Sequence, residues 1–305
     1  MSPPLAAIEA RGLGKSFLGR PALSDLSFSV GPGELYGLVG ADGAGKTTTI
    51  RALAGLMDPD RGEVRVLGRN PVEADVRESL GLMPQQYSLY RDLTVAENLR
   101  FFSRLYVLGR DVFESRAKRL LHITRLEDFQ SRRADQLSGG MYKKLALACA
   151  LLHQPRVLLL DEPTNGVDPV SRRELWALLH EFVEGGMAVL VSTPYMDEAE
   201  RCSRVGLIHH GRLLLEGPPA ALLASFDGET YEVSGGSRDQ VERVLRGRSE
   251  VRSISPSGSR LRIEAAPGSG AALRSLLDPI GAQLRQVPPM FEDLFLARIL
   301  AQEAA

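Results

Sequence analysis

The stretch GADGAGKTT, residues 40–48, constrains the fold of this chain more than any other segment. It matches the pattern G-x-x-x-x-G-K-[S/T], follows a short apolar run at residues 35–39, and opens a helical pattern over residues 46–56. Glycines carry no Cβ, so the backbone N–H groups of such a loop can wrap a phosphate, and a helix N-terminus adds partial positive charge. The Lys46 ammonium would reach the β- and γ-phosphates, and the Thr47 hydroxyl would bind Mg²⁺. The segment therefore predicts a nucleoside triphosphate site formed by Gly40, Ala41, Asp42, Gly43, Ala44, Gly45, Lys46, Thr47 and Thr48.

The composition is that of a soluble globular protein. The chain has 305 residues, 44% hydrophobic and 25% charged, enough for one large domain and a smaller one. A net charge of -1 gives no electrostatic reason to expect a nucleic-acid partner, and two cysteines suit a reducing compartment. The N-terminus lacks a secretory pattern, and no apolar run reaches the ~18–20 residues that span a bilayer. We expect a cytoplasmic protein without a transmembrane segment of its own.

The distribution of apolar runs predicts an α/β domain followed by a small α+β domain. Continuous apolar runs at residues 35–39, 156–160 and 187–191 are typical of strands buried on both faces of a mostly parallel sheet. Residues 87–153 have a helical pattern and are expected to form a helical subdomain, and residues 216–230 have the Pro/Gly content of a boundary. The rest alternates as β-α-β-β-α-β, which predicts a ferredoxin-like unit. The expected domains are residues 1–222 and 228–305.

Two acidic residues follow the second apolar run. In RVLLLDEPT, Asp161 and Glu162 emerge at the carboxyl end of a strand, the edge at which open α/β sheets bind ligands. Asp161 would hold Mg²⁺ and Glu162 would polarise the attacking water. Without the phosphate loop upstream, a plain strand end would be the better interpretation.

A second helix start lies just before these acids. In QLSGGMYKKLALACALL, Ser138 is a candidate N-cap, Gly139 and Gly140 permit close backbone approach, and apolar residues follow at helical spacing. One site has no need for two such helix N-termini, so this one would serve the nucleotide of another subunit.

Together these motifs resemble the ATP-binding cassette (ABC) ATPases, the motor subunits of ABC transporters, over about residues 5–220. Residues 40–48 resemble the Walker A loop, and residues 137–141 resemble the signature motif, with Leu137, Ser138, Gly139 and Gly140 as its site residues. Residues 160–162, which include Asp161 and Glu162, resemble the end of Walker B. The resemblance implies a P-loop NTPase cassette that binds ATP with Mg²⁺ and pairs with a second cassette, as a homodimer or a heterodimer.

The resemblance assigns three further positions. Gln85 corresponds to the glutamine that contacts Mg²⁺ and senses the membrane partner, and Asp168 to an aspartate at the dimer interface. Phe17 falls where the family has an aromatic ring that stacks on adenine, although it could equally be a core residue. Glu162, Lys46 and Gln85 would be catalytic, and Thr47, Gln85 and Asp161 would surround Mg²⁺.

The segments SLYRDLTVAENLRFF, STPYMDEAERC and VPPMFEDLFLARIL are similar to the exporter ATPases of the daunorubicin and multidrug-resistance type. Those subunits pair with separate ABC-2 permeases. The resemblance implies export of a drug-like or lipid-like substrate, and a position at the cytoplasmic face of the membrane through the permease. The role of residues 228–305 stays open.

Pro194 departs from the family, which commonly has a histidine at this point of S-T-H-Y-M-x-E-A-E. That histidine donates a hydrogen bond toward the γ-phosphate, and proline has neither a side-chain donor nor a backbone N–H. Three interpretations are open: a tolerated variation, the weak site of an asymmetric pair, or a cassette that binds ATP as a clamp and hydrolyses little. Asp42 is a second departure, since asparagine is more frequent there. A regulatory cassette and a soluble non-transport ABC protein are the alternatives to the exporter.

Overall fold

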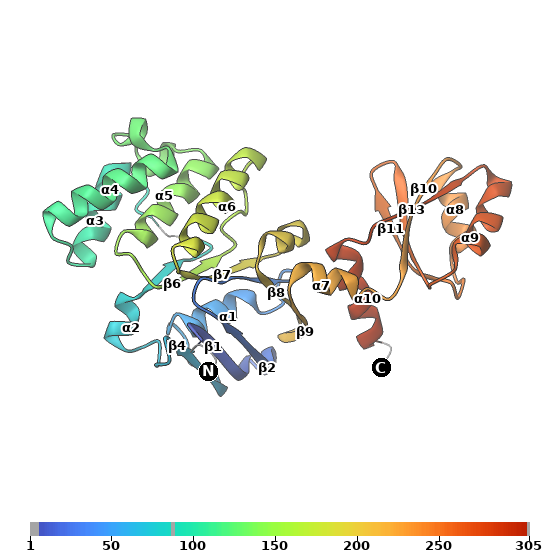
Figure 1. Cartoon of the computed structure of the whole chain (residues 1–305), viewed down its shortest axis with the longest axis horizontal. Helices are drawn as coiled ribbons and strands as arrows, with labels where there is room; N and C mark the ends of the chain where they lie inside the picture. The colour runs from blue at the N-terminus through green and yellow to red at the C-terminus, as the bar shows by residue number, and fades with distance from the viewer. Residues whose placement is uncertain (1–5, 87–88, 304–305) are drawn as a thin grey trace. The chain divides into compact units, whose positions relative to one another are not determined.

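The computed structural model describes residues 6–86 and 89–303 (Figure 1). The chain divides into two compact units, Met1–Pro218 and Pro219–Ala305. The division lies ahead of the border predicted at residue 222, because helix α7 (Pro219–Ala224) belongs with the second unit. The predicted borders at residues 1, 87 and 305 fall outside the described residues.

The first unit is built around a six-stranded sheet with the order β5-β6-β7-β3-β8-β9. The strands are β5 (Leu80–Met83), β6 (Val157–Asp161), β7 (Ala188–Thr193), β3 (Leu35–Val39), β8 (Arg204–His209) and β9 (Arg212–Gly217). All neighbours pair in parallel except β8 and β9. Every residue of β3, β6 and β7 is buried, which is why these strands read as continuous apolar runs. The predicted mostly parallel sheet is confirmed.

The helix after the phosphate loop is shorter than predicted. Helix α1 covers Lys46–Leu53, whereas the pattern indicated a helix to residue 56. Gly55 has φ +64°, and a Cβ there would lie 3.0 Å from the carbonyl carbon and oxygen of Pro71. The chain therefore leaves the helix at this glycine, whose left-handed backbone conformation disfavours other residues.

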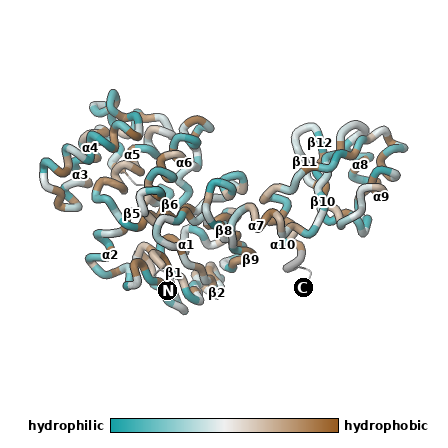
Figure 2. The backbone as a smooth tube through the Cα atoms, viewed as in Figure 1, coloured by the Kyte–Doolittle hydropathy of each residue, from teal (hydrophilic) through white to brown (hydrophobic). Residues whose placement is uncertain are grey.

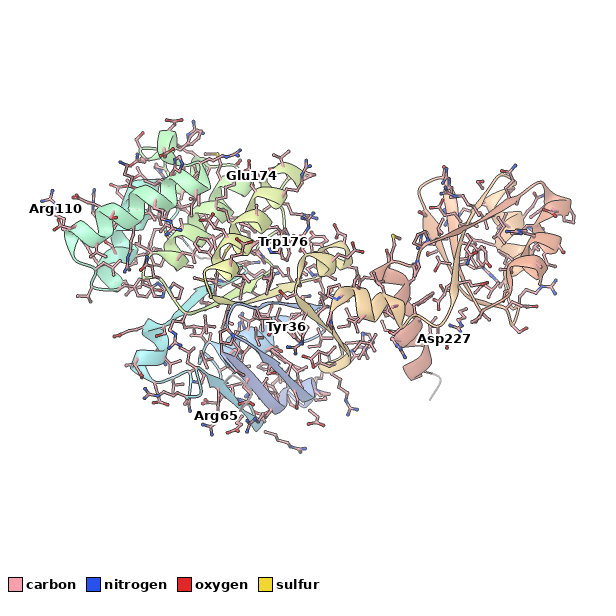
Figure 3. All side chains as sticks on the ribbon, viewed as in Figure 1. Tyr36, Arg65, Arg110, Glu174, Trp176 and Asp227 are labelled. Atoms are coloured by element: carbon pink, nitrogen blue, oxygen red, sulfur yellow. The ribbon has the colours of Figure 1, made fainter. Side chains whose placement is uncertain are left out.

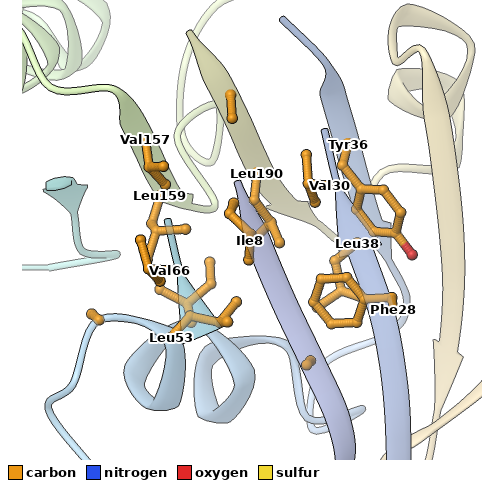
Figure 4. Packing of buried hydrophobic residues seen from close by; sticks show 14 of the residues in the cluster. Ile8, Phe28, Val30, Tyr36, Leu38, Leu53, Val66, Val157, Leu159 and Leu190 are labelled. Atoms are coloured by element: carbon orange, nitrogen blue, oxygen red, sulfur yellow. The ribbon is translucent and has the colours of Figure 1, made fainter. Parts of the chain in front are cut away.

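A three-stranded antiparallel sheet, β2-β1-β4, was not predicted. It consists of β1 (Ile8–Phe17), β2 (Arg20–Val30) and β4 (Arg61–Val66). Figure 4 shows side chains from this sheet, from the main sheet and from α1 meeting in one core, with Ile8, Leu53 and Leu190 among them. The phosphate loop and its helix are thus held between two sheets.

Three α-helices and two 3-10 turns of the first unit lie along the segment predicted to be helical. They are α3 (Val95–Leu105), α4 (Arg110–Thr124), the 3-10 turns Glu127–Phe129 and Ala134–Gln136, and α5 (Gly139–Leu151); α2 (Ala74–Glu78), α6 (Pro169–Glu184) and the 3-10 turn Met196–Arg201 flank them in sequence. Thr94 and Glu97 form a capping box at the start of α3. Hydrophobic and hydrophilic residues are mixed along the helices (Figure 2), and in the described part of the chain no helix is long and apolar enough to cross a membrane.

The second unit has one four-stranded antiparallel sheet with the order β11-β12-β10-β13. Its elements are β10 (Glu229–Ser234), α8 (Arg238–Leu245), β11 (Val251–Ser257), β12 (Arg260–Ala265), α9 (Gly270–Leu277), the 3-10 turn Asp278–Ile280, β13 (Gln283–Val287) and α10 (Phe291–Glu303). The element order after α7 is the predicted β-α-β-β-α-β, followed by one more helix. The ferredoxin-like class of this unit stays a prediction.

Candidate nucleotide site

Three segments of the predicted site meet at the carboxyl edge of the main sheet. Strand register places Val39 opposite Thr193 and Asp161 opposite Ser192, so the turns after β3, β6 and β7 lie side by side. The Gly40 N–H donates to the Thr193 carbonyl at 3.2 Å. Pro194 therefore follows β7 directly between the phosphate loop and Walker B.

The phosphate loop is fixed by contacts between main-chain groups. Gly45 has φ +110°, and a Cβ there would lie 2.7 Å from the Ala22 carbonyl oxygen. A Cβ at Gly40 would lie 2.2 Å from the Ile208 carbonyl oxygen. Gly211, in the turn after β8, donates its N–H to the Ala44 carbonyl at 2.9 Å. Only glycine satisfies these close approaches, which accounts for the spacing of glycines in the motif.

Lys46 lies inside this loop. Its side chain is 3% exposed, and its Nζ donates to the carbonyls of Gly40 and Ala41 at 2.8 and 3.0 Å. The same Nζ is 3.4 Å from Glu162 Oε1. Asp42, the unusual loop residue, has a side chain that is 91% exposed and points a carboxylate 3.9 Å from Lys46 Nζ. Lys46 is thus held inside the loop, where two main-chain oxygens and the Glu162 carboxylate surround its positive charge.

The residues predicted to surround Mg²⁺ lie together. Thr47 Oγ1 donates to Asp161 Oδ1 at 3.2 Å, and Thr47, Gln85 and Asp161 line one cavity of about 260 Å³. Hydroxyl, amide and carboxylate oxygens are hard donors of the kind Mg²⁺ prefers when phosphates complete its shell. Ser192 Oγ also donates to Asp161 Oδ1, at 2.6 Å, and so orients the carboxylate. The donor set fits Mg²⁺. Ser192, on β7, is a residue of this site that the sequence analysis did not single out.

Glu162 is buried and tightly positioned. It is 4% exposed, has φ +50°, and donates its own N–H to the Ser192 carbonyl at 3.1 Å. Its Oε2 accepts hydrogen bonds from Gln85 Nε2 at 2.7 Å and from Asn165 Nδ2 at 3.2 Å. A non-glycine residue at positive φ is uncommon and is held here by these surrounding bonds. Such an arrangement suits a carboxylate that must accept a proton in one defined direction.

Lys143 approaches the same place from α5, and no pattern in the sequence predicted it. Its Nζ donates to the carbonyls of Gln85 and Glu162, both at 3.4 Å. Burial lowers the pKa of this ammonium, while the charges of Glu162 and Asp161 act to raise it. Lys143 therefore connects α5 with the main chain at Gln85 and at Glu162, and its positive charge lies beside the two carboxylates.

The signature residues form the start of α5. Leu137 is half-buried and precedes the helix, and Ser138 is its N-cap, accepting from the Met141 N–H at 3.3 Å. A Cβ at Gly139 would lie 2.9 Å from the Gly166 carbonyl oxygen, and one at Gly140 only 2.4 Å from Ser171 Oγ. Within the chain the two glycines therefore let α5 pack against the turn after Walker B and against α6.

Replacing Gly140 by alanine is expected to lower the free energy of unfolding by about 1–3 kcal/mol, as overpacked contacts do. The added methyl would overlap both Oγ and Cβ of Ser171, at 2.4 and 2.5 Å. Urea unfolding would measure the loss, and Ser171→Gly, which removes both atoms, should recover part of it in the double variant. Additive effects of the two changes would contradict this packing.

Asp168 and Phe17 have clear local positions. Asp168 is the N-cap of α6, and its Oδ1 accepts hydrogen bonds from the N–H groups of Val170 and Ser171, both at 3.0 Å. These hydrogen bonds lower the pKa of Asp168, and the bond from the Ser171 N–H has the largest effect. Phe17 ends β1 with 48% of its surface exposed, so the alternative that it is a core residue is wrong. Lys15 Nζ lies 5.9 Å from the centroid of its ring, and about half of the side chain stays exposed.

The turn that carries Pro194 is held by one buried carboxylate. Glu198, 0% exposed, accepts from Thr193 Oγ1 at 2.6 Å, Thr164 Oγ1 at 3.0 Å and the indole of Trp176 (labelled in Figure 3) at 3.3 Å. Thr193 Oγ1 in turn accepts from the Tyr195 N–H at 3.1 Å. Glu198 therefore connects the end of β7 with the turn after Walker B and with α6.

No histidine of the described residues follows β7. His209 ends β8 and His210 follows it, at the same sheet edge but on the other side of β3. Next to Pro194, the Tyr195 hydroxyl lies 3.4 Å from Asn165 Oδ1, and Asn165 is itself bonded to Glu162. The side chain at position 194 consists of ring carbons alone and has no hydrogen-bond donor.

Comparison with known proteins identifies the family of this chain. A family model described as ABC transporter matches residues 23–165. The Nod factor export ATP-binding protein I of Rhizobium sp. (strain N33) is 37% identical over 295 residues, covering 95% of this chain and 96% of that protein. The chain belongs to the ATP-binding subunits of ABC transporters. The probable multidrug ABC transporter ATP-binding protein YbhF of Escherichia coli (strain K12) is 41% identical over 302 residues, but this chain spans only 52% of its length.

Solved structures of ABC cassettes have the same fold. An ATP-binding subunit of an ABC transporter aligns with a TM-score of 0.66 and 32% identity over 72% of this chain and 93% of that one. The cassette MJ0796, in a dimeric post-hydrolysis state bound to ADP and Pi, aligns with a TM-score of 0.63 and 26% identity, covering 69% and 98%. The chain is therefore an ABC ATPase, and cassettes of this family bind ATP and ADP. The nucleotide site at residues 40–48 stays a prediction.

Proposed function

We propose that this chain is the ATPase subunit of an exporter and drives a separate ABC-2 permease. Support comes from the printed functions of its relatives, multidrug transport and Nod factor export. The residue patterns around residues 88–102 and 192–202 also resemble exporter ATPases. The substrate would be drug-like or lipid-like, and the chain would sit at the cytoplasmic face of the membrane through the permease.

In this proposal each side chain of the nucleotide site has one task. The loop N–H groups and Lys46 hold the β- and γ-phosphates, Phe17 stacks on adenine, and Glu162 orients and deprotonates the attacking water. Thr47, Asp161 and Gln85 would hold Mg²⁺, which would neutralise charge on the phosphates. Glu162 carries the proposal, because its carboxylate lies within 3.4 Å of Lys46 Nζ and within 2.7 Å of Gln85 Nε2.

The second half of the site would come from another cassette. Ser138 is exposed at the start of α5 and makes its hydrogen bond within its own helix end. We propose that Ser138 and Gly140 face the γ-phosphate of a partner cassette, with Asp168 at the interface. The relative MJ0796 is dimeric, which supports a head-to-tail pair with two nucleotides between the cassettes.

We further propose that Pro194 weakens hydrolysis but not nucleotide binding. Removing one donor to a transition-state charge typically costs ~10²–10³ in rate. Because the phosphate loop, Walker B and Pro194 lie on one chain, a homodimer would have the defect in both sites and a heterodimer in one. The second candidate function, the weak half of an asymmetric pair, rests on this residue alone.

Replacing Pro194 by histidine is expected to raise the rate of MgATP hydrolysis at least about tenfold, because it restores a donor beside the γ-phosphate. We expect the turn to keep its backbone conformation in this variant, because the hydrogen bond from Thr193 to Glu198 holds it. Steady-state hydrolysis would be compared with nucleotide affinity, which should change by less than about threefold. Alanine at the same position is the control and should leave the rate unchanged. Equal rates for histidine and proline would identify Pro194 as a tolerated variation.

Isolation with a membrane partner tests the transport part of the proposal. The tagged chain, extracted in detergent from its native membrane, should co-purify with a multi-helix permease, and that complex should hydrolyse MgATP faster than the chain alone. Recovery with ribosomes or with DNA instead would assign the chain to the soluble ABC proteins.

A further inference from the structure

The sheet of the second unit has one apolar face and one polar face. On the first, Tyr231, Val233 and Ile263 pack with residues of α8 and α9 into a core. Strand alternation places Arg262 and Glu264 on the opposite face, where α10 packs. Arg262 forms a two-pronged ion pair with Asp293 of α10, at 2.8 and 2.7 Å. The polar face is therefore covered at this point by α10.

Beyond this ion pair, a cavity of about 420 Å³ opens in the same unit. One wall consists of apolar side chains of α10, namely Leu294, Ala297 and Leu300, and Phe226 adds an aromatic ring. The charged groups that line it are Arg252, Glu264, Arg298 and Asp227, the last labelled in Figure 3. The cavity thus combines a hydrophobic wall with two acids and two bases.

Glu264 is the unusual member of this set. It is 2% exposed, and its Oε2 accepts from Ser253 Oγ at 3.3 Å. Its Oε1 has no hydrogen-bond partner among the described residues, and the nearest cation, Arg252 Nη1, is 3.8 Å away. Burial raises the pKa of Glu264. A buried carboxylate oxygen without a donor is unfavourable, and each such group calls for an explanation.

The two arginines of the cavity differ. Arg252 donates to the main-chain carbonyl of Asp227 and lies 3.5 Å from its carboxylate. Arg298, half-buried on α10, has no ion pair within the described part of the chain. Among the described residues, Glu264 Oε1 therefore has a distant cation at Arg252 but no hydrogen-bond donor, and Arg298 in the same cavity has no acidic partner.

We propose that this cavity binds a small zwitterion with an apolar body, of the class of apolar α-amino acids. Its ammonium would donate to Glu264 Oε1, its carboxylate would pair with Arg298, and its side chain would lie on the wall formed by Leu294, Ala297 and Leu300. Pockets of roughly 300–1,000 Å³ with apolar walls and a few convergent polar groups are typical of small-molecule sites. The proposal concerns the second unit only and does not depend on transport or on hydrolysis.

Calorimetric titration of the whole chain with matched ligands tests the proposal. L-phenylalanine carries both charges, phenethylamine lacks the carboxylate and 3-phenylpropionate lacks the ammonium, with the same apolar body in all three. L-leucine, isopentylamine and 4-methylpentanoate form a second series with a smaller body. In at least one series we expect the amino acid to bind at least tenfold more tightly than either single-charge analogue.

Two variants assign the charges. Glu264→Gln and Arg298→Gln should each weaken binding of the amino acid at least tenfold, and Arg298→Gln should leave the affinity for the amine unchanged. Arg243→Gln, an exposed position on α8, is the matched control and should bind as the wild type does. Circular dichroism and MgATP affinity establish that each variant is folded.

Three results would overturn the proposal. One is the absence of binding by both amino acids at millimolar concentration. Another is equal affinity for amine and amino acid, which would assign the cavity to organic cations. The last is binding that survives both Glu264→Gln and Arg298→Gln, since the ligand would then lie elsewhere.

Discussion

Replacing Glu162 by glutamine is expected to lower the rate of MgATP hydrolysis at least about 100-fold, the contribution of a positioned general base. The change is nearly isosteric. A glutamine oxygen at the Oε2 position still accepts from Gln85 and Asn165, and the amide nitrogen takes the place of Oε1. Lys46 keeps its bonds to the carbonyls of Gly40 and Ala41. The variant therefore removes the charge and the proton acceptor while leaving the geometry of the site in place.

Single-turnover hydrolysis and nucleotide affinity, measured on the same preparation, separate chemistry from binding. Affinity for MgATP should stay within about threefold of the wild type, because the loop and Lys46 are unchanged. The measurement is made in the wild type and in the Pro194→His background, where the larger starting rate widens the range. Glu200→Gln, at an exposed site on the turn after β7, is the control. A loss below about threefold would show that another group takes the proton.

The second large effect is expected from Glu198→Ala, which should lower the free energy of unfolding by about 3–5 kcal/mol, as breaking a buried charge pair does. The change leaves the indole N–H of Trp176 and two threonine hydroxyls without their acceptor. It also strips Arg172, whose Nε lies 3.6 Å from Glu198 Oε1, of its closest carboxylate. The desolvation of these buried donors, about 1 kcal/mol or more each, accounts for most of that loss.

Urea unfolding followed by Trp176 fluorescence reports on this loss directly, because the indole itself is one of the affected groups. Glu198→Gln keeps the shape and one acceptor oxygen, and should lose less than half as much. Glu200→Ala, two residues away and exposed, should change stability by less than about 0.5 kcal/mol. A similar small value for Glu198→Ala would mean that the turn is held by its main chain instead.

The sequence predicts the glycine-rich turn and the buried strands beside it, because their features are local. A loop that wraps phosphates requires glycines at fixed spacing, and strands buried on both faces are continuous apolar runs, as in β3, β6 and β7. The antiparallel sheet could not be predicted in the same way. Its strands are partly exposed, and register shifts interrupt the pairing of β1 with both neighbours, which blurs the two-residue period.

Contacts between distant segments were also beyond prediction. The carboxyl edge of the main sheet includes Ser192, Lys143 and Glu198 only because β6, β7 and α5 come together there. No spacing in the sequence indicates that these three elements are neighbours. The close packing of Gly140 on Ser171 is another example. The sequence analysis relates this glycine only to the nucleotide of another subunit and not to packing within the chain.

The main-chain contacts of the phosphate loop have a consequence for the energetics of binding. The loop rests on two neighbouring main-chain segments: Gly211 donates its N–H to the Ala44 carbonyl, and the Ala22 carbonyl leaves no room for a Cβ at Gly45. Its conformation is thus inherited from the strands on which it rests, so binding need not bear the entropic cost of ordering it. Side chains that point outward, such as Asp42, can vary freely, because nothing in that preorganised conformation depends on them.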